Sequence, residues 1–128
     1  MRLLLDTHTL LWWAGGSSRL PRRAREAIAD DGNAVMVSAA SAWEIATKHH
    51  LGKLAAPGPL ADGMLDYLAD QEFLELGITV RHAQRAGALP GWHRDPFDRM
   101  LVAQAQLEDL TLVSNESLFD RYGVRRLW

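Results

Sequence analysis

The chain has 128 residues, 48% of them hydrophobic, so we expect one compact domain over residues 1–128 with an ordinary buried core. The absence of cysteine excludes disulfides, thiolate zinc sites and a cysteine nucleophile. Fourteen basic against sixteen acidic residues give a net charge of −2, which offers no argument for nucleic-acid binding. The apolar runs fall short of the ~20 residues that span a bilayer, and Asp6 comes too early for a signal peptide. We expect a soluble, cytoplasmic protein with no membrane partner.

Short apolar runs alternate with amphipathic segments along the chain. The apolar runs predict strands at 2–5, 34–37, 73–76, 110–113 and 124–128. The third of these is either a strand or an extended connector, and the last is an edge strand. The amphipathic segments predict helices at 8–14, 21–30, 38–50, 60–70, from 79 or 80 to 87, at 96–108 and at 118–122. Such alternation favours an α/β fold with a mostly parallel sheet and helices on both faces.

Several local features add detail to this pattern. Pro21 is expected in the first turn of its helix, and Ser38 is expected to cap the helix that follows it. The segments 52–59 and 89–94 are expected to be loops. A single apolar face is predicted for the 60–70 helix, formed by Leu60, Met64, Leu65 and Leu68.

The tryptophans divide into two groups. Trp43 is expected in the core beside Glu44. Trp12, Trp13 and Trp92 are candidates for an interface or for base stacking, although core or dimer packing is the simpler interpretation of Trp12 and Trp13.

Four acidic residues follow strands or lie on the helices after them: Asp6, Glu44, Asp98 and Glu116. The carboxyl ends of parallel strands meet at one edge of a sheet, which is where ligands bind. Carboxylates gathered there repel one another unless a cation lies between them. Mg²⁺ or Mn²⁺ is the natural occupant, because hard divalent ions prefer oxygen ligands.

Each acid also has a local structural interpretation as a helix-capping residue. Asp6 can cap the helix that starts near His8, and Glu116 can cap the last helix. Ser41 and Glu44 have the spacing of a capping box. Asp95, Pro96 and Asp98 have the spacing of an N-cap residue, a proline at the first helical position and an acid in the first turn. Four unrelated caps explain the joint pattern less simply than one shared site.

Four segments of the chain resemble the successive motifs of a known family. They read Leu-Leu-Asp-Thr-His at 4–8, Val-Ser-Ala-Ala-Ser-Ala-Trp-Glu-Ile at 37–45, His-Arg-Asp-Pro-Phe-Asp-Arg-Met-Leu-Val-Ala-Gln-Ala at 93–105 and Leu-Thr-Leu-Val-Ser-Asn-Glu at 110–116. In order and spacing they resemble PIN-domain nucleases, and most closely the VapC toxins of bacterial toxin–antitoxin pairs. The resemblance implies a PIN-like three-layer α/β/α sandwich over the whole chain.

The resemblance also implies an activity, hydrolysis of RNA phosphodiester bonds by water activated by Mg²⁺ or Mn²⁺. It maps the catalytic acids onto Asp6, Glu44, Asp98 and Glu116, of which Asp6, Asp98 and Glu116 are implied metal ligands, and Glu44 completes the shell or positions the water. Glu116 departs from the family, because Ser114-Asn115-Glu116 stands where Thr-x-Asp is usual.

Other residues of these motifs are expected to support the acids. We expect four of them to orient a carboxylate or a metal-bound water, namely Thr7, Ser38, Ser41 and Asp95. Contact with RNA is expected of Lys48, Arg94 and Arg99, although Glu44 and Lys48 also have the spacing of a simple helical ion pair. The five histidines are scattered without a zinc-ligand spacing.

The family further implies a homodimer and a VapB-type antitoxin, through which any DNA binding would occur. Two alternatives remain open at this stage. One is a phosphate-accepting receiver domain, although the only lysines, Lys48 and Lys53, lie mid-chain rather than after the last strand. The other is a catalytically weak or inactive PIN fold that binds RNA or protein. The sequence does not name the RNA.

Overall fold

The computed structural model describes residues 1–56 and 58–128. Its five strands form one sheet in the order β3-β2-β1-β4-β5, and each neighbouring pair is parallel. The strands are β1 (Arg2–Leu5), β2 (Ala34–Ser38), β3 (Leu74–Leu76), β4 (Thr111–Val113) and β5 (Arg126–Leu127). The expected α/β/α sandwich is therefore confirmed, with a sheet that is parallel at every described pairing.

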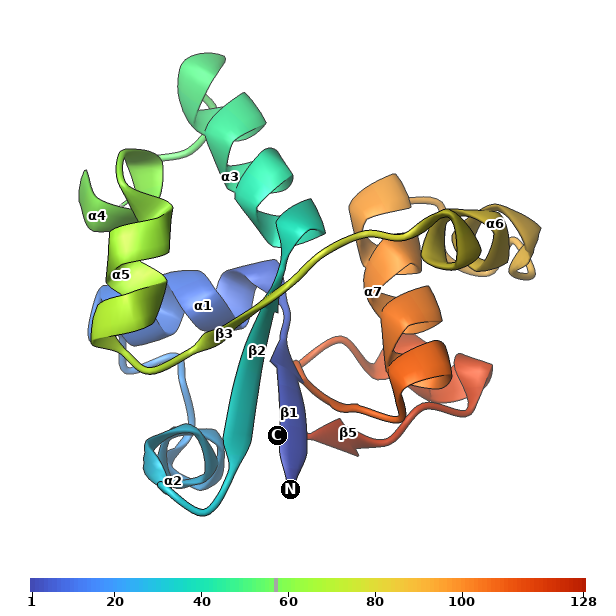
Figure 1. Ribbon diagram of the computed structural model, residues 1–128, viewed down its shortest axis with the longest axis horizontal. Helices are drawn as coiled ribbons and strands as arrows, with labels where there is room; N and C mark the ends of the chain where they lie inside the picture. The colour runs from blue at the N-terminus through green and yellow to red at the C-terminus, as the bar shows by residue number, and fades with distance from the viewer. Residues whose placement is uncertain (57) are drawn as a thin grey trace.

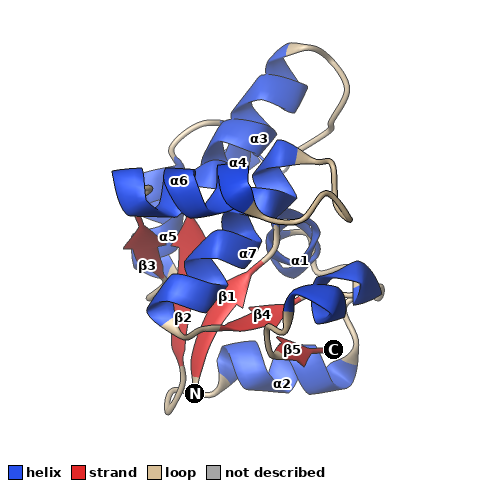
Figure 2. Cartoon of the chain, turned by 90° about the vertical axis from the view of Figure 1, so that its right-hand side faces the viewer, coloured by secondary structure: helices blue, strands red, loops and turns tan. Residues whose placement is uncertain are grey.

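Helices cover both faces of the sheet. They are α1 (Thr7–Ala14), α2 (Arg22–Ala29), α3 (Ala39–His50), α4 (Gly58–Ala61), α5 (Met64–Asp70), α6 (Val80–Ala88), α7 (Pro96–Glu108) and the 3₁₀ helix η1 (Ser117–Tyr122). Figure 1 shows α6 and α7 on one side of the strands and α1, α2, α4 and α5 on the other. Figure 2, viewed from the side of α6 and α7, places these two helices in front of the strands.

Alternation along β1 divides the core into two parts. Leu3 and Leu5 pack into the cluster beneath α1, α2 and α5, whereas Leu4 packs into the cluster beneath α7 and η1. All three leucines are fully buried. A strand buried on both faces in this way is typical of a parallel sheet covered by helices.

The strand order creates a switch point at β1. The chain runs from β1 to β2 and β3 on one side, then returns to place β4 and β5 on the other. Ligands of open α/β sheets bind outside the carboxyl ends of strands at such a point. The order also differs from the 2-1-3-4-5 order of receiver-like folds, which argues against the receiver alternative.

The structure corrects three local expectations. The helix expected at 60–70 is broken into α4 and α5 at Gly63, whose φ of 88° favours glycine, and Leu65 is 67% exposed. Pro21 is the N-cap residue of α2 and precedes its first turn. Trp43 is 63% exposed, so the prediction that it lies in the core is wrong. The edge of α3 that carries it contacts Phe97 and is not covered by another layer.

The loop expected at 52–59 includes Pro57, which lies outside the described residues. In the described part of the chain, Gly58 and Pro59 belong to α4, so that loop ends earlier than expected. No helix of residues 1–56 and 58–128 combines the length and the apolar character needed to cross a membrane.

Candidate active site

A pocket of about 280 Å³ lies beyond the carboxyl ends of β1 and β4. Its walls include all four acids singled out in the sequence, namely Asp6, Glu44, Asp98 and Glu116, and a fifth acid, Asp95. These side chains come from β1, α3, α7 and the segment after β4, which are far apart in the chain. The fold thus gathers carboxylates from four segments around one volume.

Asp6 and Glu116 each cap a helix with one carboxylate oxygen. The backbone N–H of Thr9 donates to Oδ1 of Asp6 at 2.7 Å, and that of Leu118 donates to Oε1 of Glu116 at 3.1 Å. The capping interpretation is therefore correct for both residues. A carboxylate has two oxygens, and the second oxygen of each residue remains available at the pocket wall.

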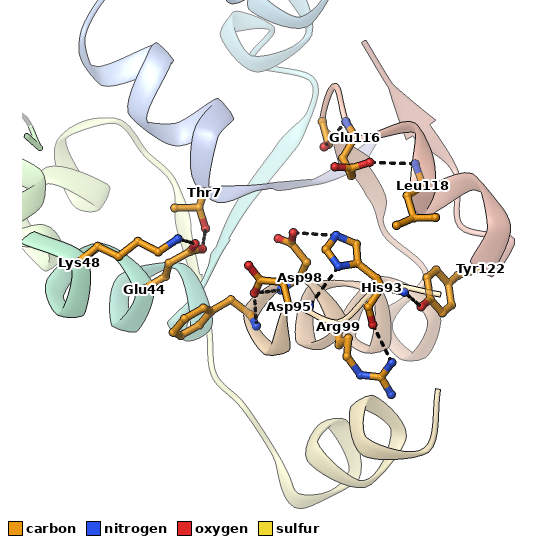
Figure 3. A network of polar contacts seen from close by, with 12 residues as sticks. Thr7, Glu44, Lys48, His93, Asp95, Asp98, Arg99, Glu116, Leu118 and Tyr122 are labelled. Carbon is orange, nitrogen blue, oxygen red and sulfur yellow. Dashed lines mark hydrogen bonds and ion pairs between the residues drawn. The ribbon is translucent and has the colours of Figure 1, made fainter. Parts of the chain in front are cut away.

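Glu44 is held by polar partners on both of its oxygens. Thr7 donates its hydroxyl to Oε1 at 2.6 Å, and Lys48 forms an ion pair with Oε2. Thr7 also lies 3.1 Å from the hydroxyl of Ser41, so α1 and α3 are joined beneath the pocket. Glu44 is only 4% exposed, and Figure 3 shows Thr7 and Lys48 reaching it from different directions. Glu44 does not form the capping box expected with Ser41, because Ser38 caps α3.

Lys48 is the one cation that lines this pocket in the described structure. Its hydrogen bond to Glu44 raises the pKa of Lys48, and the charges of Glu44, Asp95 and Asp98 act in the same direction against desolvation. The ammonium group is therefore charged at neutral pH and compensates part of the acidic wall.

Asp95 and Asp98 lie at the start of α7. Oδ1 of Asp95 accepts from the backbone N–H groups of Phe97 (2.8 Å) and Asp98 (3.3 Å), which confirms that Asp95 is the helix cap. Burial is the main cause that raises the pKa of Asp98 to about 7, followed by the negative charges of Asp95, Glu44, Asp6 and Glu116. Repulsion among the five carboxylates therefore adds to the cost of burying a charged Asp98.

His93 is a contact of Asp98 that sequence reasoning did not assign. The backbone N–H of Asp95 donates to Nδ1 of His93 at 3.2 Å, so a neutral ring carries its proton on Nε2. Nε2 lies 2.9 Å from Oδ2 of Asp98, in contact with it but outside the angles of a hydrogen bond. Figure 3 shows the ring facing the Asp98 carboxylate. The only sequence signal for this contact is the position of His93 two residues before the cap.

A family model described as PIN domain matches residues 3–125, nearly the whole chain. The chain belongs to the PIN-domain family. No curated protein matches it. Two solved structures show the same fold as this PIN domain at low sequence identity.

One of these is VapBC2 from Rickettsia felis, crystallised with a DNA fragment from their promoter. It has a TM-score of 0.70 and 17% identity, with 99% of this chain and 98% of that chain covered. The other is FitAcB from Neisseria gonorrhoeae, with a TM-score of 0.60, 16% identity and coverage of 98% and 96%.

Three residues that the sequence predicted for the site do not line this pocket, and two of them form hydrogen bonds within the fold. Ser38 caps α3 and donates its hydroxyl to Gln104 at 2.6 Å. Arg94 is exposed and does not line the pocket. The guanidinium of Arg99, for which a contact with RNA was expected, donates to the backbone carbonyls of Ala86, Gly87, Leu89, Pro90 and His93. His8 and Asn115 line the pocket although the sequence did not mark them as site residues, and Trp12, a candidate for an interface or for base stacking, lines it as well.

The side chains of the pocket have the oxygen atoms that a hard divalent cation prefers, but they are not yet arranged around a single point. Among the described residues, no three acidic or histidine side chains stand close enough together to form a ready ligand group. The pocket nevertheless offers carboxylate oxygens from five acids against the single ammonium group of Lys48, so negative charge is in excess among its described lining residues. Oxygen ligands and excess negative charge are what Mg²⁺ and Mn²⁺ require.

Proposed function

We propose that this PIN domain is an Mg²⁺- or Mn²⁺-dependent endoribonuclease and the toxin of a type II toxin–antitoxin pair. One observation supports the proposal most strongly. Carboxylates from four separate segments line a single pocket at the switch point of the sheet, where burial, followed by the charges of the other acids, raises the pKa of Asp98 to about 7. Perturbed acids gathered in one cleft are typical of a functional site.

In this proposal the residues of the pocket have different roles. Asp6 and Asp98 hold the cation, and Glu116 supports a second cation position. When bound, the cation supplies an acidified water and positive charge at the phosphoryl oxygens. Glu44, fixed by Thr7 and Lys48, orients a water near Asp6. His93 positions the carboxylate of Asp98 through its contact with Oδ2.

The other supporting residues act through these acids. Ser41 contacts the hydroxyl of Thr7, and Ser38 and Asp95 fix the starts of α3 and α7. Lys48 offers its ammonium group to a phosphate of the RNA at the pocket wall. Arg94, exposed beside Asp95, provides a further contact with the backbone of the RNA.

The partner side of the proposal rests on the motif resemblance to VapC toxins and on the shared fold. We propose a cytoplasmic homodimer that binds a VapB-type antitoxin and reaches DNA only through it. The Rickettsia felis VapBC2 structure, which contains promoter DNA, has this fold over almost the full length of the chain. A basic antitoxin side chain near the acids would inhibit the enzyme by competing with the cation.

Amide substitutions of the proposed ligands test the activity. Asp6→Asn and Asp98→Asn keep the shape of the side chain but remove its charge, so each is expected to lower cleavage of a mixed RNA pool at least ~100-fold. Asp31→Asn changes an exposed acid outside the pocket and is the matched control. Cleavage is measured in Mn²⁺ with purified protein, and far-ultraviolet circular dichroism checks the fold.

Two results would count against the proposal. Full activity in either folded ligand variant would remove Asp6 or Asp98 from the mechanism. If the unmodified protein cleaves no RNA in Mn²⁺ and none in EDTA, the result would support the alternative of a PIN fold that binds RNA or protein without cutting it.

A further inference from the structure

A second hollow, of about 390 Å³, adjoins the acidic pocket. His8 and Trp12 line both volumes, so the two share a wall formed by these residues. Leu54 and Arg19 also line the hollow. In contrast to the acidic pocket, none of the described residues that line this hollow is acidic. A molecule held at the acids can therefore extend into a chemically different compartment.

Helix α1 places the two compartments in a fixed relation. Asp6 caps this helix, and His8 and Trp12 lie four residues apart, on one face of it. Their ring centroids are 5.7 Å apart with planes tilted by 43°. The spacing between the acid and Trp12 is therefore set by rigid helix geometry of about 1.5 Å per residue.

Trp12 is held from behind. Its ring lies 5.8 Å from that of Trp128 and packs against the core beneath α1 and α2, which leaves it half-buried. A half-buried indole with one side supported and the other lining a hollow has little freedom to lose when a flat ligand stacks on it. Trp13, its neighbour, points elsewhere, since it donates to Gln71 at 2.9 Å and contacts Phe73.

Arg19 belongs to a basic run with Arg22, Arg23 and Arg25, and it differs from two of these arginines. Arg22 pairs with Glu26, and Arg25 donates to the carbonyls of Ser17 and Leu20. Within residues 1–56 and 58–128, no hydrogen bond or ion pair engages the guanidinium of Arg19. It therefore presents an uncompensated cation at the rim of the hollow, opposite in sign to the acidic pocket.

We propose that this hollow binds a nucleobase of single-stranded RNA adjacent to the phosphate held at the acids. Trp12 stacks on the base, His8 borders it, and Arg19 contacts the next phosphate. Aromatic rings joined to a cationic rim are how proteins hold unpaired bases, because every base has a face that stacks. This assignment rests on the proposed nuclease function and adds the residues that select an unpaired strand.

A comparison of two oligomers of equal charge tests the base site. Binding of fluorescein-labelled 12-nucleotide oligoadenylate and of an abasic ribose-phosphate 12-mer is measured by fluorescence anisotropy in Ca²⁺. The unmodified protein is expected to bind oligoadenylate about tenfold more tightly. Trp12→Leu should reduce this preference to within about threefold, while Trp12→Phe, which keeps a stacking ring, should retain most of it.

Trp13→Leu is the matched control, since it removes a neighbouring half-buried indole that does not line the hollow. Thermal melting compares the stability of the variants. Equal affinity of the unmodified protein for both oligomers would overturn the proposal and would favour a protein segment as the occupant. An equal loss of preference in Trp12→Leu and Trp13→Leu would also overturn it.

A second pair of variants tests the cationic rim. Arg19→Ala should weaken both oligomers by a similar factor, whereas Arg23→Ala, an exposed arginine of the same run, should weaken neither. Equal effects of the two substitutions would overturn the role of Arg19. RNA cleavage is assayed in parallel. If the protein cleaves RNA but binds oligoadenylate and the abasic oligomer equally, only the base site is overturned. If it neither binds nor cleaves, the nuclease proposal is overturned as well.

Discussion

The acids of this PIN domain combine local and shared roles at the level of single atoms. Asp6, Asp95 and Glu116 each use one oxygen to cap a helix and also line the pocket. For Asp6 and Glu116 the two roles coincide because the carboxyl end of a parallel strand is followed by a helix that needs a cap, whereas Asp95 caps a helix that follows a loop. An acid in that position can satisfy the helix with one lone pair and offer another to a ligand.

The pKa of Asp98 predicts how stability varies with pH. Since the folded state raises this pKa from 3.8 to about 7, folded protein binds more protons than unfolded protein between these values. The contribution of Asp98 to the free energy of unfolding is therefore fully present below pH 4 and is lost as pH rises towards 7. Asp98→Asn should remove this dependence.

At pH 8 and without divalent ions, we expect Asp98→Asn to unfold with a free energy roughly 1–4 kcal/mol higher than the unmodified protein. At pH 4 the two should be nearly equal. Urea unfolding at both pH values measures the difference. A variant that is less stable than the unmodified protein at pH 8 would show that repulsion does not govern this carboxylate.

The role of a residue was predictable from the sequence where its position in the chain alone decides that role. Asp6 and Asp95 were identified as caps because each directly precedes a helix. The contact between His93 and Asp98 and the exposure of Trp43 depend instead on which elements pack together, which one sequence does not specify. Arg99 shows the same limit, because its carbonyl partners lie on a loop and a helix end upstream.

At the scale of elements, Arg99 joins α7 to the end of α6 and to the loop that follows it. Its two terminal nitrogens donate to carbonyls between Ala86 and His93 at 2.7–3.4 Å. This arrangement holds the loop that carries His93 and Asp95 over the pocket. It requires the planar fork of a guanidinium, which the single ammonium of lysine cannot reproduce.

We predict that Arg99→Lys lowers the free energy of unfolding by about 1–3 kcal/mol, because several partly buried carbonyls lose their donor. Arg94→Lys, at an exposed position five residues earlier, should change it by less than about 0.5 kcal/mol. Chemical denaturation of both variants provides the measurement. Equal stability of the two variants would show that the loop is held by other contacts, such as the Tyr122 hydroxyl that receives the N–H of His93.

Most elements were predictable from periodicity, and the exceptions have a physical cause. The 96–108 helix was predicted with its observed bounds, since Asp95 and Pro96 mark its start. The segment at 60–70 has helical spacing of its apolar residues, yet Gly63 adopts a left-handed conformation and divides it. Periodicity does not report such a backbone break, and after it Leu60 and Leu68 are buried while Leu65 is exposed.

At the scale of the whole molecule, strand order turns four distant motifs into one pocket. Because β1 lies between β2 and β4, the segments that follow these three strands meet at one end of the sheet. The alternation of strands and helices predicted the fold class but not this order. The motif resemblance implied a three-layer sandwich, and the strand order itself comes from the structure.

The central claim is that these carboxylates jointly hold a divalent cation, and a calorimetric titration with Mn²⁺ tests it most directly. The unmodified protein should show saturable binding at neutral pH, while Asp6→Asn and Asp98→Asn should each bind at least ~10-fold more weakly. Asp31→Asn should bind as tightly as the unmodified protein. Absence of saturable binding by the unmodified protein, or equal binding by all four proteins, would contradict the account.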